Sequence, residues 1–156
     1  MSVRSALPLV LVPLVVGACG GGSSKPKEPA RLTQKQFVAA ANRVCIDSDR
    51  RIFRIGALST APSGWARTAA AAKVAIADMA AVRPPLAARR GFDTMMREAA
   101  EVRRQIQLVH DALVAHKYAD ARTAQFAATD ADSRIKRQAK KLGLTFCEQL
   151  LTNWPA

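Results

Sequence analysis

The feature that most constrains the fold is a long run of apolar residues spaced alternately three and four positions apart. The run consists of Phe92, Met95, Ala99, Val102, Ile106, Val109 and Leu113. Because an α-helix has 3.6 residues per turn, this spacing places every member on one stripe of a helix. Such a long stripe is typical of a seam in a helical bundle. The pattern predicts a helix over about 86–116 that packs against other helices through this stripe.

Three further segments complete a bundle. One of them, at about 119–142, repeats the alternating spacing with Ala121, Ala124, Ala128, Ala131, Ile135, Gln138 and Leu142. Apolar faces also predict helices over about 34–57 and 65–82. The connection between the last two long helices is too short for a crossover, so they are expected to form an antiparallel hairpin. The sequence thus predicts an all-α, antiparallel four-helix bundle with a short C-terminal helix.

Capping signals mark the start of the first helix and the end of the fourth. Thr33 and Gln36 have the spacing of a capping box before the first helix. Gly143 fits the left-handed position that ends a helix. Thr145 and Glu148 repeat the capping-box spacing and predict the short C-terminal helix.

The beginning of the chain has the composition of an export signal. Arg4 is followed by an apolar run over 6–16, which is interrupted by prolines. A membrane-spanning helix needs about 20 apolar residues, so this run fits a cleaved signal better than a permanent span. The small residues Gly17 and Ala18 directly precede Cys19, and a stretch rich in glycine and serine follows.

This stretch resembles the lipobox of bacterial lipoprotein precursors, with Val16 standing where that family most often has leucine. The resemblance implies a lipoprotein signal peptide at 1–18 and acylation, of the palmitate type, on Cys19 as the mature N-terminus. It also implies a lipidated flexible tether at 19–31 and a helical bundle domain at 32–156 on the extracytoplasmic face of the cell membrane. The competing interpretation is an ordinary secretory signal with an incidental cysteine.

A broader resemblance covers the rest of the chain. The lipobox, the start at Leu32 and Thr33, and the order of Cys45, Gly143 and Cys147 are similar to those of small helical lipoproteins of actinobacteria. These motifs are loose and lie far apart in the sequence. The resemblance therefore implies a location and a fold without supplying an activity.

Two cysteines remain after Cys19, and they are disulfide candidates. An even pair in an oxidising compartment favours a bond between Cys45 and Cys147. A metal or redox site is disfavoured because the chain has no C-x-x-C spacing and no histidine near either cysteine. In an up-down-up-down bundle, a tail that turns back after the last helix would bring the two cysteines together.

The chain is strongly basic, with a net charge of +12. An exported protein meets anionic phospholipid headgroups and acidic envelope polymers rather than nucleic acid, so no nucleic-acid partner is expected. The densest basic cluster, a candidate anion-binding surface, consists of Arg134, Lys136, Arg137, Lys140 and Lys141. The alternative is that these cations simply suit the C-terminal end of a helix dipole.

No pattern in the sequence predicts an active site. His110 and His116 are the only histidines, and a spacing of six places them on different faces of a helix. Asp130 and Asp132 are two residues apart and do not share a helix face either. Phosphate loops, nucleophile elbows, zinc spacings and calcium loops are all missing from the sequence. We therefore expect no metal, no cofactor and no enzymatic activity.

These features predict a membrane-anchored, non-enzymatic binding or scaffold module of the cell envelope, with a protein partner of unknown identity. The alternative is an extracytoplasmic ligand carrier, or an enzyme whose site is assembled from residues distant in sequence. A pocket with convergent polar groups would favour the alternative.

Overall fold

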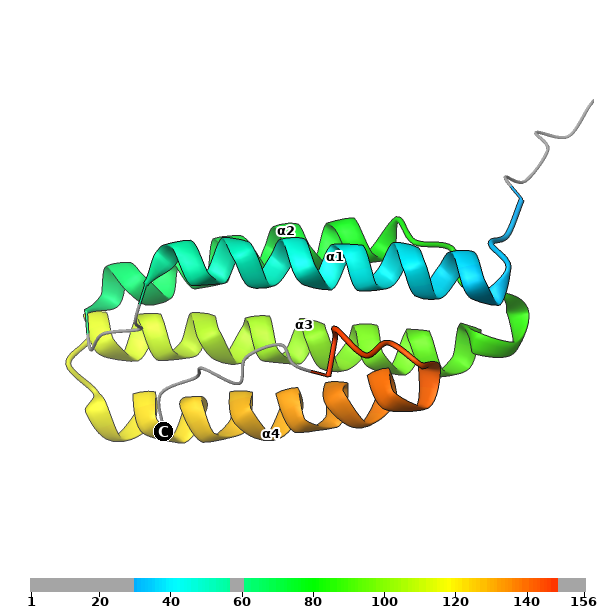
Figure 1. Ribbon diagram of the computed structural model, residues 1–156. Coiled ribbons are helices and arrows are strands. Elements are labelled where there is room, and N and C mark those ends of the chain that lie inside the picture. The colour runs from blue at the N-terminus through cyan, green and yellow to red at the C-terminus, as the bar shows by residue number, and fades with distance from the viewer. Residues whose placement is uncertain (1–29, 57–60, 149–156) are drawn as a thin grey trace, which may run out of the picture.

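The computed structural model describes residues 30–56 and 61–148, which form an all-α bundle without strands in these two ranges. Its helices are α1 (Gln34–Ile55), α2 (Pro62–Ala80), α3 (Leu86–Val114) and α4 (Tyr118–Leu142). Figure 1 shows that they run alternately in opposite directions, side by side. The predicted helical bundle is confirmed. The expected signal peptide and nearly all of the expected tether lie outside the described residues.

Several helix boundaries differ from the expected ones by one to three residues: α2 ends at Ala80 rather than Val82, and α4 begins at Tyr118 rather than Ala119. α2 begins at Pro62 rather than Trp65, because proline lacks an N–H and its fixed φ suits the first helical position. α3 ends at Val114 rather than His116. His116 has a φ of 57°, which lies in the left-handed region and turns the chain into α4. α1 ends at Ile55, two residues before the expected Ala57, because Gly56 follows with a φ of 82° and leaves the helical conformation.

The predicted caps at Thr33 and Gly143 form, whereas Thr145 and Glu148 make no capping-box hydrogen bond with each other. The Thr33 hydroxyl accepts the backbone N–H of Gln36, and the Gln36 side chain accepts the backbone N–H of Thr33. At the end of α4, Gly143 adopts the left-handed conformation, with φ 74° and ψ 26°. The Leu144 N–H then donates to the Ala139 carbonyl over 2.9 Å and the Gly143 N–H to the Lys140 carbonyl over 3.1 Å, which are the two bonds that define a Schellman motif. Leu144 is fully buried, so the motif also sends the chain back toward the core.

The returning segment is fastened to α1. Cys45 and Cys147 form a disulfide with an S–S distance of 2.02 Å and a Cα–Cα distance of 5.2 Å, so the predicted bond is present in the structure. Figure 1 shows this segment folding back from the end of α4 alongside the bundle. Residues 145–148 form turns, and the rest of the expected C-terminal helix lies outside the described residues.

The core is divided into two hydrophobic clusters along the bundle. The first cluster, at the end where α1 begins, includes Phe37, Cys45, Met79, Phe92, Met95 and Leu144. The second cluster, at the opposite end, includes Trp65, Val102, Ile106, Val109, Ala121 and Ala131. α3 and α4 make the most extensive contact of any two helices, while α1 packs mainly on α2. No described hydrophobic residue of α1 beyond Cys45 belongs to either cluster, so α1 packs less closely in its second half.

Candidate functional site

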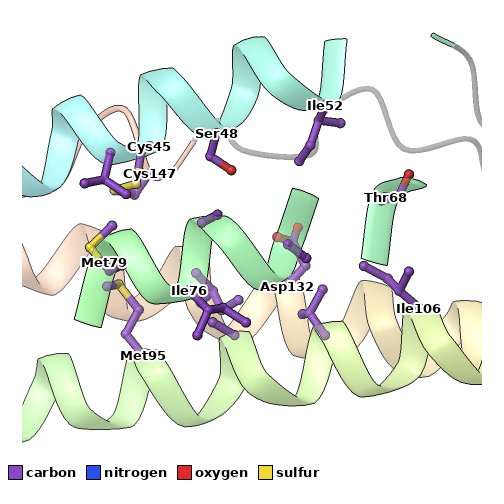
Figure 2. Close-up of a pocket in the computed structure, with 16 residues that line it drawn as sticks. Cys45, Ser48, Ile52, Thr68, Ile76, Met79, Met95, Ile106, Asp132 and Cys147 are labelled. Carbon is purple, nitrogen blue, oxygen red and sulfur yellow. A yellow bond between two sulfur atoms is a disulfide. The ribbon is translucent and has the colours of Figure 1, made fainter. Parts of the chain in front are cut away.

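A cavity of about 100 Å³ lies in the middle of the bundle, where the two clusters meet. All four helices and the C-terminal segment line it. Figure 2 shows the disulfide and two methionines, Met79 and Met95, toward one end, with Thr68 and Ile106 toward the other. Some lining residues, such as Ile52 and Ile76, are only half-buried, so the cavity extends toward the surface.

The cavity arises from short side chains at the centre of the helix interfaces. Ala72 and Ala75 on α2 and Ala99 on α3 all line it. An alanine extends only one carbon from the backbone, so three alanines leave volume that larger side chains would fill. The α1 backbone approaches that of α2 more closely than those of α3 and α4, and α1 contributes Val44, Cys45, Ser48 and Ile52 to the cavity wall. The sequence seam predicted close helix contacts, and these occur mainly between α3 and α4.

Three polar side chains line the cavity, and they differ in their hydrogen bonding. The Thr68 hydroxyl donates to the Gly64 carbonyl over 3.0 Å, so its donor already has an acceptor within the protein. Ser48 is 6% exposed, and its hydroxyl has no hydrogen-bond partner among the described residues. Figure 2 shows the Ser48 side chain pointing from α1 toward the cavity. A buried hydroxyl without a partner is uncommon because burial removes its bonds to water.

Asp132 is the third polar residue, and it is a carboxylate in a largely apolar surrounding. It is 6% exposed and lies on α4. Its Oδ2 atom is 2.8 Å from Nζ of Lys136, one turn later on the same helix. Burial raises the pKa of the Asp132 carboxyl above its ordinary value, and the hydrogen bond from the Lys136 ammonium opposes that rise. No described residue hydrogen-bonds its other oxygen, Oδ1.

The structure places the predicted cysteines in two different situations. Cys45 and Cys147 are both buried, and the disulfide between them forms part of the cavity wall. Cys19, the predicted acylation site, lies outside the described residues. The disulfide therefore connects the candidate site to the segment that fastens the C-terminal part of the chain.

The predicted basic cluster on α4 divides into paired and unpaired cations. Arg134 makes ion pairs with Glu98 on α3 and with Asp130 on its own helix, and Lys136 pairs with Asp132. The remaining members are exposed and make no ion pair with any described residue; they are Arg137, Lys140 and Lys141. Anion binding by this surface stays a prediction, and the unpaired cations are its best candidates.

The histidines do not form a site together. His110 Nδ1 is 2.9 Å from the Asp111 carboxylate, and His116 Nδ1 is 3.3 Å from the Tyr118 hydroxyl. Within residues 30–56 and 61–148, no group of three or more His, Cys, Asp or Glu side chains is placed to hold a metal ion. None of the described helices is both long and apolar enough to cross a membrane.

Sequence reasoning missed the two polar residues that give the cavity its chemistry. Ser48 falls in the apolar stripe of the first helix, between Val44 and Ile52. That position could have indicated a functional residue, because a hydroxyl in a buried stripe needs a hydrogen-bond partner. Asp132 directly follows the seam residue Ala131, and this adjacency could have indicated burial. Only the packing of α1 and α4 shows that both residues line the same cavity.

Comparison of the chain with protein-family models, with curated proteins and with solved structures finds no match. The chain's own residues provide a disulfide, a cavity and a stretch before Cys19 that resembles a lipobox.

Proposed function

We propose that the protein is an extracytoplasmic lipoprotein, anchored to the cell membrane through an acyl group on Cys19, that acts as a non-enzymatic binding module of the cell envelope. The observation that carries this proposal is the disulfide between Cys45 and Cys147. Structural disulfides persist in oxidising compartments and are rare in the cytosol. The one cysteine left over is Cys19, which lies in the lipobox-like stretch.

The arrangement of the bundle supports a defined orientation at the membrane. The Gln34 side chain donates to the Leu142 carbonyl over 3.4 Å, so the end of α4 lies beside the start of α1. Figure 1 shows both at the same end of the bundle. The tether predicted before α1 would therefore hold the unpaired cations Lys140 and Lys141 near the bilayer. Anionic headgroups attract such cations by about 1 kcal/mol each.

The intact mass of the protein extracted from its native membrane tests the anchor. We expect a chain that begins at Cys19, carries a diacylglyceryl-type adduct and gains two hydrogen atoms on reduction. A Cys19→Ala variant should lose the adduct and keep the two-hydrogen gain. As a matched control, a Cys147→Ser variant should keep the adduct and lose the gain. A full-length, unacylated and reduced wild-type chain would refute the proposal.

The cavity favours a second function, that of a ligand carrier. The observation in its favour is the buried Ser48 hydroxyl, which lines the cavity without a partner among the described residues. Binding sites for small molecules combine apolar walls with a few polar groups that orient the ligand. A carrier is itself a binding module, so the two functions are compatible.

A further inference from the structure

The walls of the cavity determine the polarity and the size of the main part, or body, of a ligand. Apart from Ser48, Thr68 and Asp132, the lining residues are apolar or belong to the disulfide. An engineered apolar cavity of about 150 Å³ is known to bind benzene. The present cavity, at about 100 Å³, therefore encloses on the order of four carbon atoms, and a body of up to about six carbons would extend through its open side toward the half-buried Ile52 and Ile76.

Ser48 sets the first requirement on a polar head group. The residue is 6% exposed, and its side chain points from α1 toward the cavity with no hydrogen-bond partner among the described residues. A hydroxyl can both donate and accept a hydrogen bond. A ligand that carries a polar head at this point would replace the bond to water that burial removed.

Asp132 and Lys136 set the charge of that head group. The free Oδ1 atom of Asp132 is an acceptor, so the head must carry a donor. A carboxylate head has no proton to donate and would be repelled by Asp132. An ammonium head would place a second cation near Lys136, which already pairs with Asp132 over 2.8 Å. A neutral hydroxyl head donates and accepts without adding a charge to the apolar interior.

From this geometry we infer that the cavity binds a small neutral amphiphile with a short apolar body and one hydroxyl head. Its body lies among Met79, Met95 and Ala99, and its hydroxyl bonds to Ser48 and Asp132. This inference names the ligand class of the proposed binding role and rests on that role.

The test uses the full chain in lipid nanodiscs, with ¹³C-methyl-labelled methionine as the reporter. Met79 and Met95 line the cavity, whereas Met96 is half-buried beside the first cluster and does not line it. The probes are 1-hexanol, hexanoate and hexylammonium, which share one six-carbon body. We expect 1-hexanol to shift the Met79 and Met95 methyl signals saturably and to leave Met96 unchanged. Hexanoate and hexylammonium should bind roughly tenfold or more weakly.

Two pairs of variants locate the site. Ser48→Ala should weaken 1-hexanol binding by roughly three- to tenfold, the loss of one hydrogen bond, while the exposed Ser63→Ala has no effect. Ala99→Leu fills the cavity and should abolish binding. The neighbouring Ala100→Leu makes the same change at an exposed position and should leave binding intact.

Several results would overturn the inference. These are the absence of a saturable shift at Met79 and Met95, equal affinity for hexanoate, or unchanged binding by Ser48→Ala or Ala99→Leu. Repeating the titration with Cys19→Ala separates this test from that of the anchor. If the intact mass shows no acyl group on the native protein and that protein still binds 1-hexanol, the proposed anchor is refuted and the cavity site is not. A correctly acylated protein that does not bind it refutes the cavity site alone.

Discussion

The backbone N–H of Phe146 donates to Oδ1 of Asn42 over 3.2 Å, joining positions 104 residues apart. The disulfide between Cys45 and Cys147 lies one residue further along the C-terminal segment and about one turn further along α1. One hydrogen bond and one covalent bond thus hold the returning segment against the first helix. The same segment contributes Cys147 to the cavity wall, so its attachment also shapes the candidate site.

Replacing both disulfide cysteines by serine should lower the free energy of unfolding by about 2–5 kcal/mol. The disulfide spans 102 residues, and closing a long loop restricts the unfolded chain strongly. Asn42→Ala, which removes only the hydrogen bond, should cost about 1 kcal/mol. Urea denaturation of both variants measures these values, and Cys19→Ala serves as the control. If the double serine variant lost no more than Asn42→Ala, the disulfide would contribute little to stability.

Gly143→Ala should destabilise the protein by about 1–2 kcal/mol, because Gly143 has a φ of 74°. An added Cβ there meets no atom within 4 Å, so the cost comes from the backbone alone. Gly143→Asn should cost less, since asparagine tolerates the left-handed region. Thermal unfolding checks both.

Gly91→Ala is the contrasting control for that prediction. Gly91 lies within α3, where alanine gains about 1 kcal/mol of helix propensity over glycine. Its added Cβ would lie 3.2 Å from Cδ2 of Leu142, a side-chain atom that can shift. We therefore expect little net change. A loss as large as that of Gly143→Ala would show that backbone conformation is not the deciding factor.

Asp132→Asn should stabilise the protein at pH 7, because the net effect of its surroundings is to disfavour the charged carboxylate in the folded state. Burial raises the pKa of Asp132 in the folded state, so folding favours its neutral form. The free-energy cost of burying the charged Asp132 carboxylate is fully present at pH values above its folded-state pKa. It disappears as the pH falls through the folded pKa toward the unfolded value. The advantage of the variant should therefore shrink on acidification, which thermal unfolding between pH 7 and pH 3 would measure.

The matched control for Asp132 is Asp130→Asn, two residues earlier on the same helix. The Asp130 side chain is 70% exposed and pairs with Arg134, so its removal should change stability by less than about 0.5 kcal/mol. A pH-independent loss of stability in Asp132→Asn would mean that the ion pair with Lys136 outweighs the cost of burial.

Charge reversal at Lys140 and Lys141 should weaken binding of the protein to vesicles that contain phosphatidylglycerol, by roughly fivefold or more for each position. Lys117→Glu together with Arg122→Glu makes the same change of charge at exposed residues around the other end of α4. That control should have a smaller effect, because those residues lie far from the predicted anchor. Vesicle flotation at two salt concentrations is the measurement. Equal effects of both pairs would argue against the proposed orientation.

Local patterns were sufficient to predict the four helices and the caps at Thr33 and Gly143, but placed other helix ends only to within about three residues. The alternating seam from Phe92 to Leu113, the capping box at Thr33 and the left-handed position of Gly143 all depend on residues within one or two turns of each other. Such signals can be interpreted without knowing what packs against them. The pairing of Cys45 with Cys147 was also predicted from the sequence, because assigning Cys19 to the lipobox-like stretch left two cysteines that an up-down topology could bring together.

By itself, then, the sequence determined an all-α bundle, its capping motifs and its disulfide, since these depend on periodicity, local hydrogen bonding and cysteine count. Only the tertiary structure decided that α1 packs mainly on α2 and that three alanines leave a cavity between the two clusters. It also decided that Ser48 and Asp132, on different helices, line that cavity together. Burial and partnership depend on the distances between helices, which no local pattern encodes.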